Sequence, residues 1–121
     1  MKNKHLNKIK GDFGEELACK FLRDNGYEIL TRNYKNYFGE IDIIAKYKRQ
    51  IIFIEVKTRT NLNYGEGIEA INRYKKRHIE NTAKVFIKQN KLEKFQISFD
   101  AIQILKNKNS LKIKYVKQIF Y

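Results

Sequence analysis

Two adjacent segments in the middle of the chain carry a clear β-strand pattern. Residues 38–46 and 51–58 are rich in β-branched and aromatic side chains, which are the residue types that favour strands. Only residues 47–50 separate the two segments, and so short a connection predicts an antiparallel hairpin. In the simplest register, Lys46 pairs with Ile51.

This register brings acidic side chains together. It places Asp42 opposite Glu55 and Glu40 opposite Lys57, and all four project from one face because side chains alternate along a strand. Directly opposed like charges repel, whereas a divalent cation between the carboxylates would turn that repulsion into a binding site. Oxygen ligands favour Mg²⁺ or Mn²⁺. The alternative is a solvated strand face on which Glu40 and Lys57 form an ion pair.

The hydrophobic periodicity predicts two helices and three further strands around this hairpin. Apolar side chains recur at helical spacing in both predicted helices, and the dipeptide Asn25-Gly26 ends the first of them. The resulting order α-β-β-β-α-β-β predicts an α/β fold with a mixed central sheet flanked by helices. The predicted elements are a helix over 11–25, strands over 27–32, 38–46, 51–58 and 95–105, a turn over 33–36, a polar loop over 59–67, a helix over 68–89, and a last strand or terminal extension over 111–121.

The composition changes this picture only through charge, which indicates a kind of partner. The chain has 121 residues and a formal net charge of +13, which predicts one domain and anionic partners, nucleic acid before anionic membranes. Many of the charges are lysines, so compositional bias is a competing explanation. Residues 1–10 are predicted to form a basic flexible arm, and residues 11–121 a single domain.

The single cysteine, Cys19, excludes an intramolecular disulfide and a zinc site built from several thiolates. It indicates the reducing cytoplasm as the location. No apolar run approaches the roughly 20 residues of a membrane span, so no membrane association is expected.

Three other polar positions have competing interpretations. Glu15 follows Asp12 at the spacing of a capping box, which makes a helix-capping role the simpler one. The basic run over 75–78 is either a solvated helix face or a phosphate-binding patch. Asp100 lies within a predicted strand, and exposure to solvent is its simplest interpretation.

Several short motifs occur in a definite order along the chain. They are 11–18 (GDFGEELA), 32–33 (RN), 39–45 (GEIDIIA), 53–59 (FIEVKTR), 64–65 (YG), the helix with Lys75 and Ala83, and 99–100 (FD). In order and spacing this set resembles the YraN-like family of uncharacterised bacterial proteins, placed in the restriction-endonuclease-like superfamily with its PD-(D/E)xK nuclease motif. The resemblance covers nearly the whole chain and extends to archaeal Holliday-junction resolvases. One departure is Ile41, which stands where a proline often precedes the motif aspartate.

The resemblance implies a restriction-endonuclease-like fold and assigns roles by position. Asp42 and Glu55 would bind a divalent metal, Mg²⁺ or Mn²⁺, with the Val56 carbonyl as a further ligand. Lys57 would orient the attacking water. Glu15 corresponds to an acid that such nucleases often carry on a helix, a role compatible with capping.

Basic residues around this motif are expected to contact the nucleic-acid backbone without reading its sequence. They are Arg59, Lys75, Lys76 and Arg77, and the loop over 61–67 is expected to lie over the substrate. DNA is expected before RNA, with branched or structured DNA first by analogy. A homodimer is an open expectation, since resolvases pair into dimers.

The sequence thus predicts a divalent-metal-dependent endonuclease that hydrolyses phosphodiester bonds. Two alternatives remain at this point. A non-catalytic nucleic-acid-binding protein that keeps the fold would bind without metal, with steep salt dependence. An interaction protein, whose charge is compositional, would bind nucleic acid weakly at physiological salt.

Overall fold

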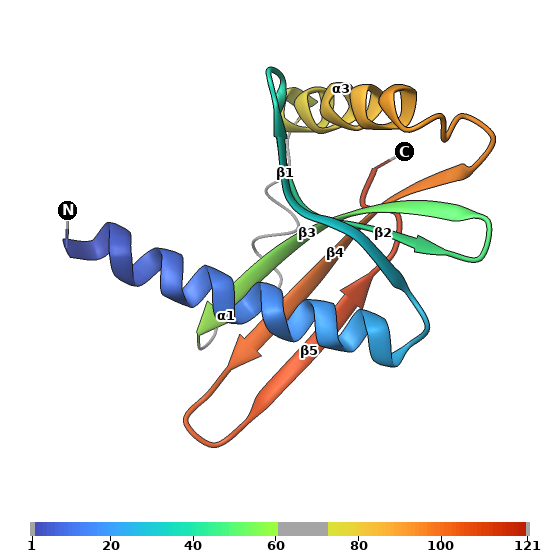
Figure 1. The fold of residues 1–121 in the computed structure, drawn as a ribbon. Coiled ribbons are helices and arrows are strands. Elements are labelled where there is room, and N and C mark those ends of the chain that lie inside the picture. Colours follow the sequence, from blue (N-terminus) through green and yellow to red (C-terminus); the bar gives the residue numbers. More distant parts are fainter. Residues whose placement is uncertain (1, 61–72, 121) are drawn as a thin grey trace.

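In the described part of the chain, a five-stranded sheet has one helix on each face (Figure 1). The computed structural model describes the backbone of residues 2–60 and 73–120, and the side chains of residues 13–60 and 73–120. The predicted order α-β-β-β-α-β-β is confirmed. The elements are α1 (Lys2–Asp24), β1 (Glu28–Asn36), β2 (Gly39–Tyr47), β3 (Gln50–Thr60), α3 (Arg73–Gln89), β4 (Gln96–Lys106) and β5 (Leu111–Val116).

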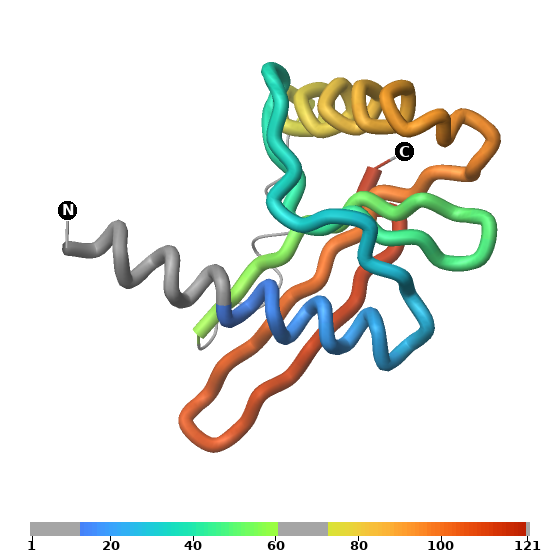
Figure 2. The backbone as a smooth tube through the Cα atoms, in the orientation of Figure 1, coloured from blue at the N-terminus to red at the C-terminus, as the bar shows by residue number. Residues whose placement is uncertain are grey.

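The strands lie in the sheet in sequence order, but not all are antiparallel. β1, β2 and β3 form an antiparallel meander, β4 is parallel to β3, and β5 is antiparallel to β4. A parallel pair needs a crossover connection, and α3 lies in the connection between β3 and β4. Figure 2 shows the β4–β5 hairpin extending away from α3.

Each face of the sheet buries its own hydrophobic core. Under α1, the buried side chains of Ala18, Cys19 and Leu22 pack on alternate residues of β2, β3 and β4, among them Ile43 and Ile54. Under α3, a second core forms. It contains Ile41, Ile44, Ile51, Phe53, Ala83, Phe86 and Ile87. The central strand β3 contributes to both cores, which holds its backbone in place on both sides.

Two predicted boundaries are wrong at the start of the fold. The first helix begins at Lys2 rather than at residue 11, so Asp12 lies inside the helix and the capping box is not at a helix start. Whether residues 1–10 are flexible stays a prediction. β1 continues through the predicted turn over 33–36 because the ladder with β2 extends to the pair Asn36 and Gly39.

Other boundaries agree closely or lie outside the described part of the chain. β3 continues to Thr60, two residues past its predicted end, because it remains paired with β4 to that point. The predicted loop over 61–67 and the first part of the predicted second helix, including Ile68 and Ile71, lie outside the described residues. Within the described residues, no helix combines the length and apolar character needed to cross a membrane.

Candidate functional site

The site forms where the ladder between β2 and β3 ends. The predicted register is confirmed, since Lys46 pairs with Ile51 and the ladder runs to the pair Ile43 and Ile54. It stops one pair before Asp42 and Glu55, so the prediction that these two residues form a directly opposed pair is wrong. There the Val56 N–H donates a hydrogen bond to Asp42 Oδ2 over 2.8 Å. A carboxylate thus takes the acceptor position that a main-chain carbonyl holds along the rest of the ladder.

The end of the ladder also overturns the predicted pairing of Glu40 with Lys57. Glu40 pairs instead with Lys35 of β1, and Lys57 forms an ion pair with Glu55 on its own strand. Near Asp42 the period-two alternation of β2 fails, because Ile41 joins the core under α3 whereas Ile43 joins the core under α1. The face to which β2 presents its side chains therefore switches near Asp42.

Glu55 lies between two lysines. Its Oε1 is 2.6 Å from Lys75 Nζ and 3.1 Å from Lys57 Nζ. Its side chain is only 16% exposed. The next residue, Val56, packs against the opposite core, so alternation presents Glu55 and Lys57 to the pocket while Ile54 and Val56 anchor the strand.

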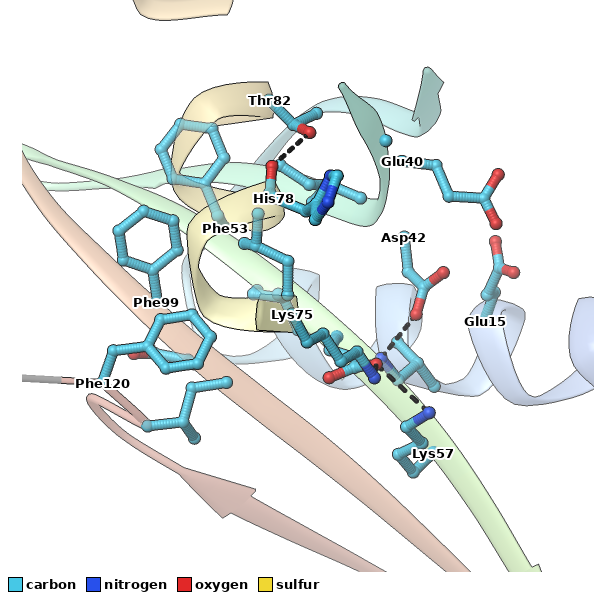
Figure 3. A pocket seen from close by; sticks show the side chains of 18 of the residues that line it. Glu15, Glu40, Asp42, Phe53, Lys57, Lys75, His78, Thr82, Phe99 and Phe120 are labelled. Atoms are coloured by element: carbon cyan, nitrogen blue, oxygen red, sulfur yellow. Dashed lines mark hydrogen bonds and ion pairs between the residues drawn. The ribbon is translucent and has the colours of Figure 1, made fainter. Parts of the chain in front are cut away.

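Glu15 reaches the same pocket from α1 (Figure 3). The helix approaches β3 so closely that a Cβ added to Gly14 would lie 2.3 Å from Thr58 Oγ1. Glycine at this position therefore lets the helix bring the next residue, Glu15, towards Asp42. Nη2 of Arg32, in β1, lies 4.0 Å from Glu15 Oε1. Arg32 also forms an ion pair with Glu16. In Figure 3, Glu15 and Asp42 approach the same space from a helix and a strand.

These side chains line a pocket of about 910 Å³, within the range of small-molecule and cofactor sites. Burial raises the pKa of Asp42, the Val56 N–H opposes that shift, and the nearby charge of Glu55 adds to it. A carboxyl group with a raised pKa in a pocket is typical of functional sites. A bound cation would relieve both causes of the shift.

The donor atoms fit a hard divalent cation. Asp42, Glu55 and the Val56 carbonyl would offer oxygen only, the ligand type of Mg²⁺ and Mn²⁺. Among the described side chains, no three acids, histidines or cysteines gather closely enough to form a ready ligand cluster. Mg²⁺ in proteins commonly binds through one or two carboxylates and keeps several waters.

The predicted basic residues differ in how they lie relative to the pocket. Arg59 and Lys75 line the pocket. Lys76 lies beside it, with Nζ 5.9 Å from the ring centre of Phe120, which belongs to the pocket wall. Arg77 is exposed and does not line the pocket.

The expectation that Asp100 is exposed is wrong. It is 2% exposed, and its carboxylate accepts hydrogen bonds from Ser98 Oγ at 2.5 Å, from the Gln118 N–H at 2.9 Å and from the Tyr115 hydroxyl. These bonds hold the segment after β5 against β4, where Ile119 and Phe120 complete the pocket wall. The Phe99-Asp100 motif marked this position in the sequence. Nothing in the neighbouring sequence indicated which groups would donate hydrogen bonds to Asp100.

Several pocket residues lay outside the predicted site, among them Phe38 of the β1–β2 turn and Tyr74 in the first turn of α3. His78, the last residue of the predicted basic run, lines the same pocket. An aromatic side chain next to a basic run was the signal available for Tyr74.

Comparison with known proteins identifies the family. The model of the uncharacterised protein family UPF0102 matches residues 14–104. A UPF0102 protein of Clostridium acetobutylicum is 42% identical over 117 residues, which cover 95% of this chain and 96% of the relative. One from Caldanaerobacter subterraneus subsp. tengcongensis is 41% identical over 112 residues, covering 93% and 92%. The chain belongs to the UPF0102 family, and the predicted YraN-like membership is confirmed.

Proposed function

We propose that this member of an uncharacterised family is a divalent-metal-dependent endonuclease that hydrolyses phosphodiester bonds in nucleic acid. One observation carries the proposal: Asp42 and Glu55 line one pocket on either side of the Val56 main chain, with Lys57 on the same face. The order acid, acid-x-Lys on adjacent strands supports placement in the PD-(D/E)xK superfamily.

Each residue of the site has a proposed role. Asp42, Glu55 and the Val56 carbonyl would hold Mg²⁺ or Mn²⁺, which supplies Lewis-acid polarisation of a phosphate and a more acidic bound water. Lys57 would orient the attacking water and stabilise negative charge that develops on the phosphate. Glu15, at the edge of the same pocket, would accept a hydrogen bond from a water in the site.

The basic residues support a polyanionic substrate. Arg59 and Lys75 line the pocket with the acids, and the net charge of +13 favours association with nucleic acid. These groups suit contacts to phosphates, which position a nucleic acid without reading its sequence. DNA is proposed before RNA, and the cytoplasm is the proposed location because Cys19 is a buried free thiol.

A second candidate function is metal-independent nucleic-acid binding on the same fold. It is favoured by one observation, the two lysine ammonium groups within 3.1 Å of Glu55 Oε1. These cations already neutralise the acid, so the site is balanced without a metal. In this case the positive surface alone would bind the polyanion.

A cleavage panel tests the proposal. Wild type, Glu55→Ala and the control Glu93→Ala would be incubated with Mg²⁺, Mn²⁺ or a chelator, on duplex, single-stranded and four-way-junction DNA and on RNA. Glu93 is an exposed acid that does not line the pocket, so its variant matches the charge change. We expect cleavage by wild type and Glu93→Ala, and a loss of about 100-fold or more in Glu55→Ala, comparable to removing one group that stabilises a transition state.

The outcomes separate the two candidates. Cleavage that persists equally in Glu55→Ala would assign the activity to a contaminant. No cleavage by any form, together with equal binding of the oligonucleotides by wild type and Glu55→Ala, would overturn the nuclease and leave the binding protein.

A further inference from the structure

Exposed aromatic side chains surround the entrance of the pocket. Tyr37 and Phe38 form the turn between β1 and β2 and are 96% and 39% exposed. Tyr74, in the first turn of α3, is 73% exposed. Phe38, Tyr74 and His78 line the same pocket as Asp42 and Glu55. We call Phe38, Tyr74 and His78 the aromatic rim.

The rim is held together across two elements. The Phe38 carbonyl lies 2.9 Å from His78 Nδ1, and the rings of Tyr74 and His78 lie with their centres 4.3 Å apart. The rings of Tyr37 and Phe38 meet edge to face at 5.4 Å. The β1–β2 turn is therefore attached to α3 through the rim.

A second set of contacts fixes the turn. Asn36 Oδ1 accepts the Phe38 N–H at 2.9 Å, and Asn36 Nδ2 donates to the Thr82 carbonyl at 3.2 Å. The exposed rings are thus presented by a braced turn and a helix rather than by loose side chains. A surface held in place loses little conformational entropy when a ligand binds.

We propose that the aromatic rim stacks on unpaired nucleobases, so that the protein acts on nucleic acid with a single-stranded segment at the pocket. This inference rests on the proposed function and specifies its substrate class. Aromatic rings beside basic residues are the arrangement with which proteins hold single strands, because every base presents a flat face to stack on. In a duplex those faces are covered by neighbouring base pairs.

The charges beside the aromatic rim favour a nucleic acid over a protein partner. Lys75 lines the pocket next to Tyr74, and Arg73, Lys76 and Arg77 adjoin it in the same helix. The first turn of α3 contains no acidic residue. Aromatic rings suited to bases and cations suited to phosphates therefore occur together in residues 73–78.

The test measures binding without metal. Two labelled single-stranded DNAs of equal length would be compared by fluorescence anisotropy in a chelator, one with normal bases and one with a central run of abasic sites. Their charges are equal, so their difference reports contacts to bases. We expect wild type to bind the normal strand about tenfold more tightly, equivalent to about 1.4 kcal/mol, and to bind it more tightly than a duplex of the same length.

Matched variants test whether the aromatic rim causes the preference for the normal strand over the abasic strand. Tyr74→Ala combined with Phe38→Ala should reduce the ratio of the two affinities to near one, while Tyr74→Phe should keep it. Phe13→Ala is the control, since Phe13 is an exposed aromatic residue that does not line the pocket. Circular dichroism of the double variant checks that it is folded.

Equal binding of normal and abasic strands by wild type, or preference for the duplex, would overturn the inference. So would an unchanged ratio in the folded double variant, which would leave the rim as a surface for a protein. Because no metal and no cleavage are involved, a failure of the proposed nuclease is seen only in the cleavage panel and a failure of stacking only here.

Discussion

Two aspartates on nearby strands differ in how the fold satisfies their charge. Asp100 of β4 is nearly inaccessible and accepts hydrogen bonds from Ser98, Tyr115 and Gln118. Asp42 of β2 accepts the Val56 N–H and faces a pocket that it shares with the like charge of Glu55. An acid surrounded by donors serves the fold, whereas an acid in a pocket beside another acid is suited to bind a ligand.

The two acids are nevertheless linked through the pocket. The bonds to Asp100 hold residues 117–120 against β4, the Ile119 N–H donates to the Phe99 carbonyl at 2.7 Å, and the Phe120 ring lies 5.5 Å from that of Phe99. Phe99 and Phe120 line the pocket. Burial, followed by the hydrogen bond to Asp100, raises the pKa of Tyr115, so its hydroxyl remains a donor. The structural acid thus supports one wall of the site that the other acid faces.

The largest effect is expected from Asp100→Ala. The substitution leaves the Tyr115 hydroxyl and the Gln118 N–H without their acceptor, so we expect the free energy of unfolding to fall by about 3 kcal/mol and Tm by about 10 °C or more. Chemical denaturation and thermal melting measure it. The exposed control Glu93→Ala should stay within about 0.5 kcal/mol of wild type. A similarly small effect of Asp100→Ala would mean that Asp100 does not stabilise the fold more than an exposed acid does.

Asp42→Asn is expected to have the opposite sign. The amide oxygen can still accept the Val56 N–H, while the cost of a buried charge beside Glu55 disappears, so we expect a gain of about 1 kcal/mol in stability at neutral pH. The folded-state pKa of Asp42 lies above its ordinary value, so wild type loses stability as the pH rises through the window from about 4 to that raised pKa. The advantage of the variant should therefore vanish at low pH and be full above the window.

Denaturation of both forms across pH 3–8 checks this prediction. A variant less stable than wild type at neutral pH would mean that the fold satisfies the ionised carboxylate of Asp42. The same variant should lack metal-dependent cleavage if the proposed function is correct.

The smallest effect is expected from Lys75→Gln. Lys75 Nζ lies 2.6 Å from Glu55 Oε1 and so competes with any cation for that oxygen. Removal of this ammonium group should raise the affinity for Mn²⁺ about fivefold, which corresponds to about 1 kcal/mol of binding free energy. Calorimetry, or the electron paramagnetic resonance of free Mn²⁺, measures the affinity. Lys88→Gln, an exposed lysine at the end of the same helix, is the control. Equal Mn²⁺ affinity in wild type, Lys75→Gln and Lys88→Gln would mean that Glu55 is not a metal ligand.

The sequence predicted the central hairpin because its information is local. Period-two alternation placed Glu55 and Lys57 on one face and Ile54 and Val56 on the other, and the short connection defined the register. Pairing of Glu40 with Lys57 failed because alternation assumes a ladder that continues, and this one ends at Ile43. Local pattern carries no signal for the point at which two strands separate.

The sequence by itself thus determined the order of elements, the hairpin and the acids that it presents. Only the tertiary structure decided which distant groups meet them: Glu15 through the close approach of Gly14 to Thr58, Lys75 across the crossover to Glu55, and the buried donors around Asp100. The physical reason is the range of each interaction. Periodicity and turn length act between near neighbours, whereas these contacts depend on how two separate cores dock the helices on the sheet.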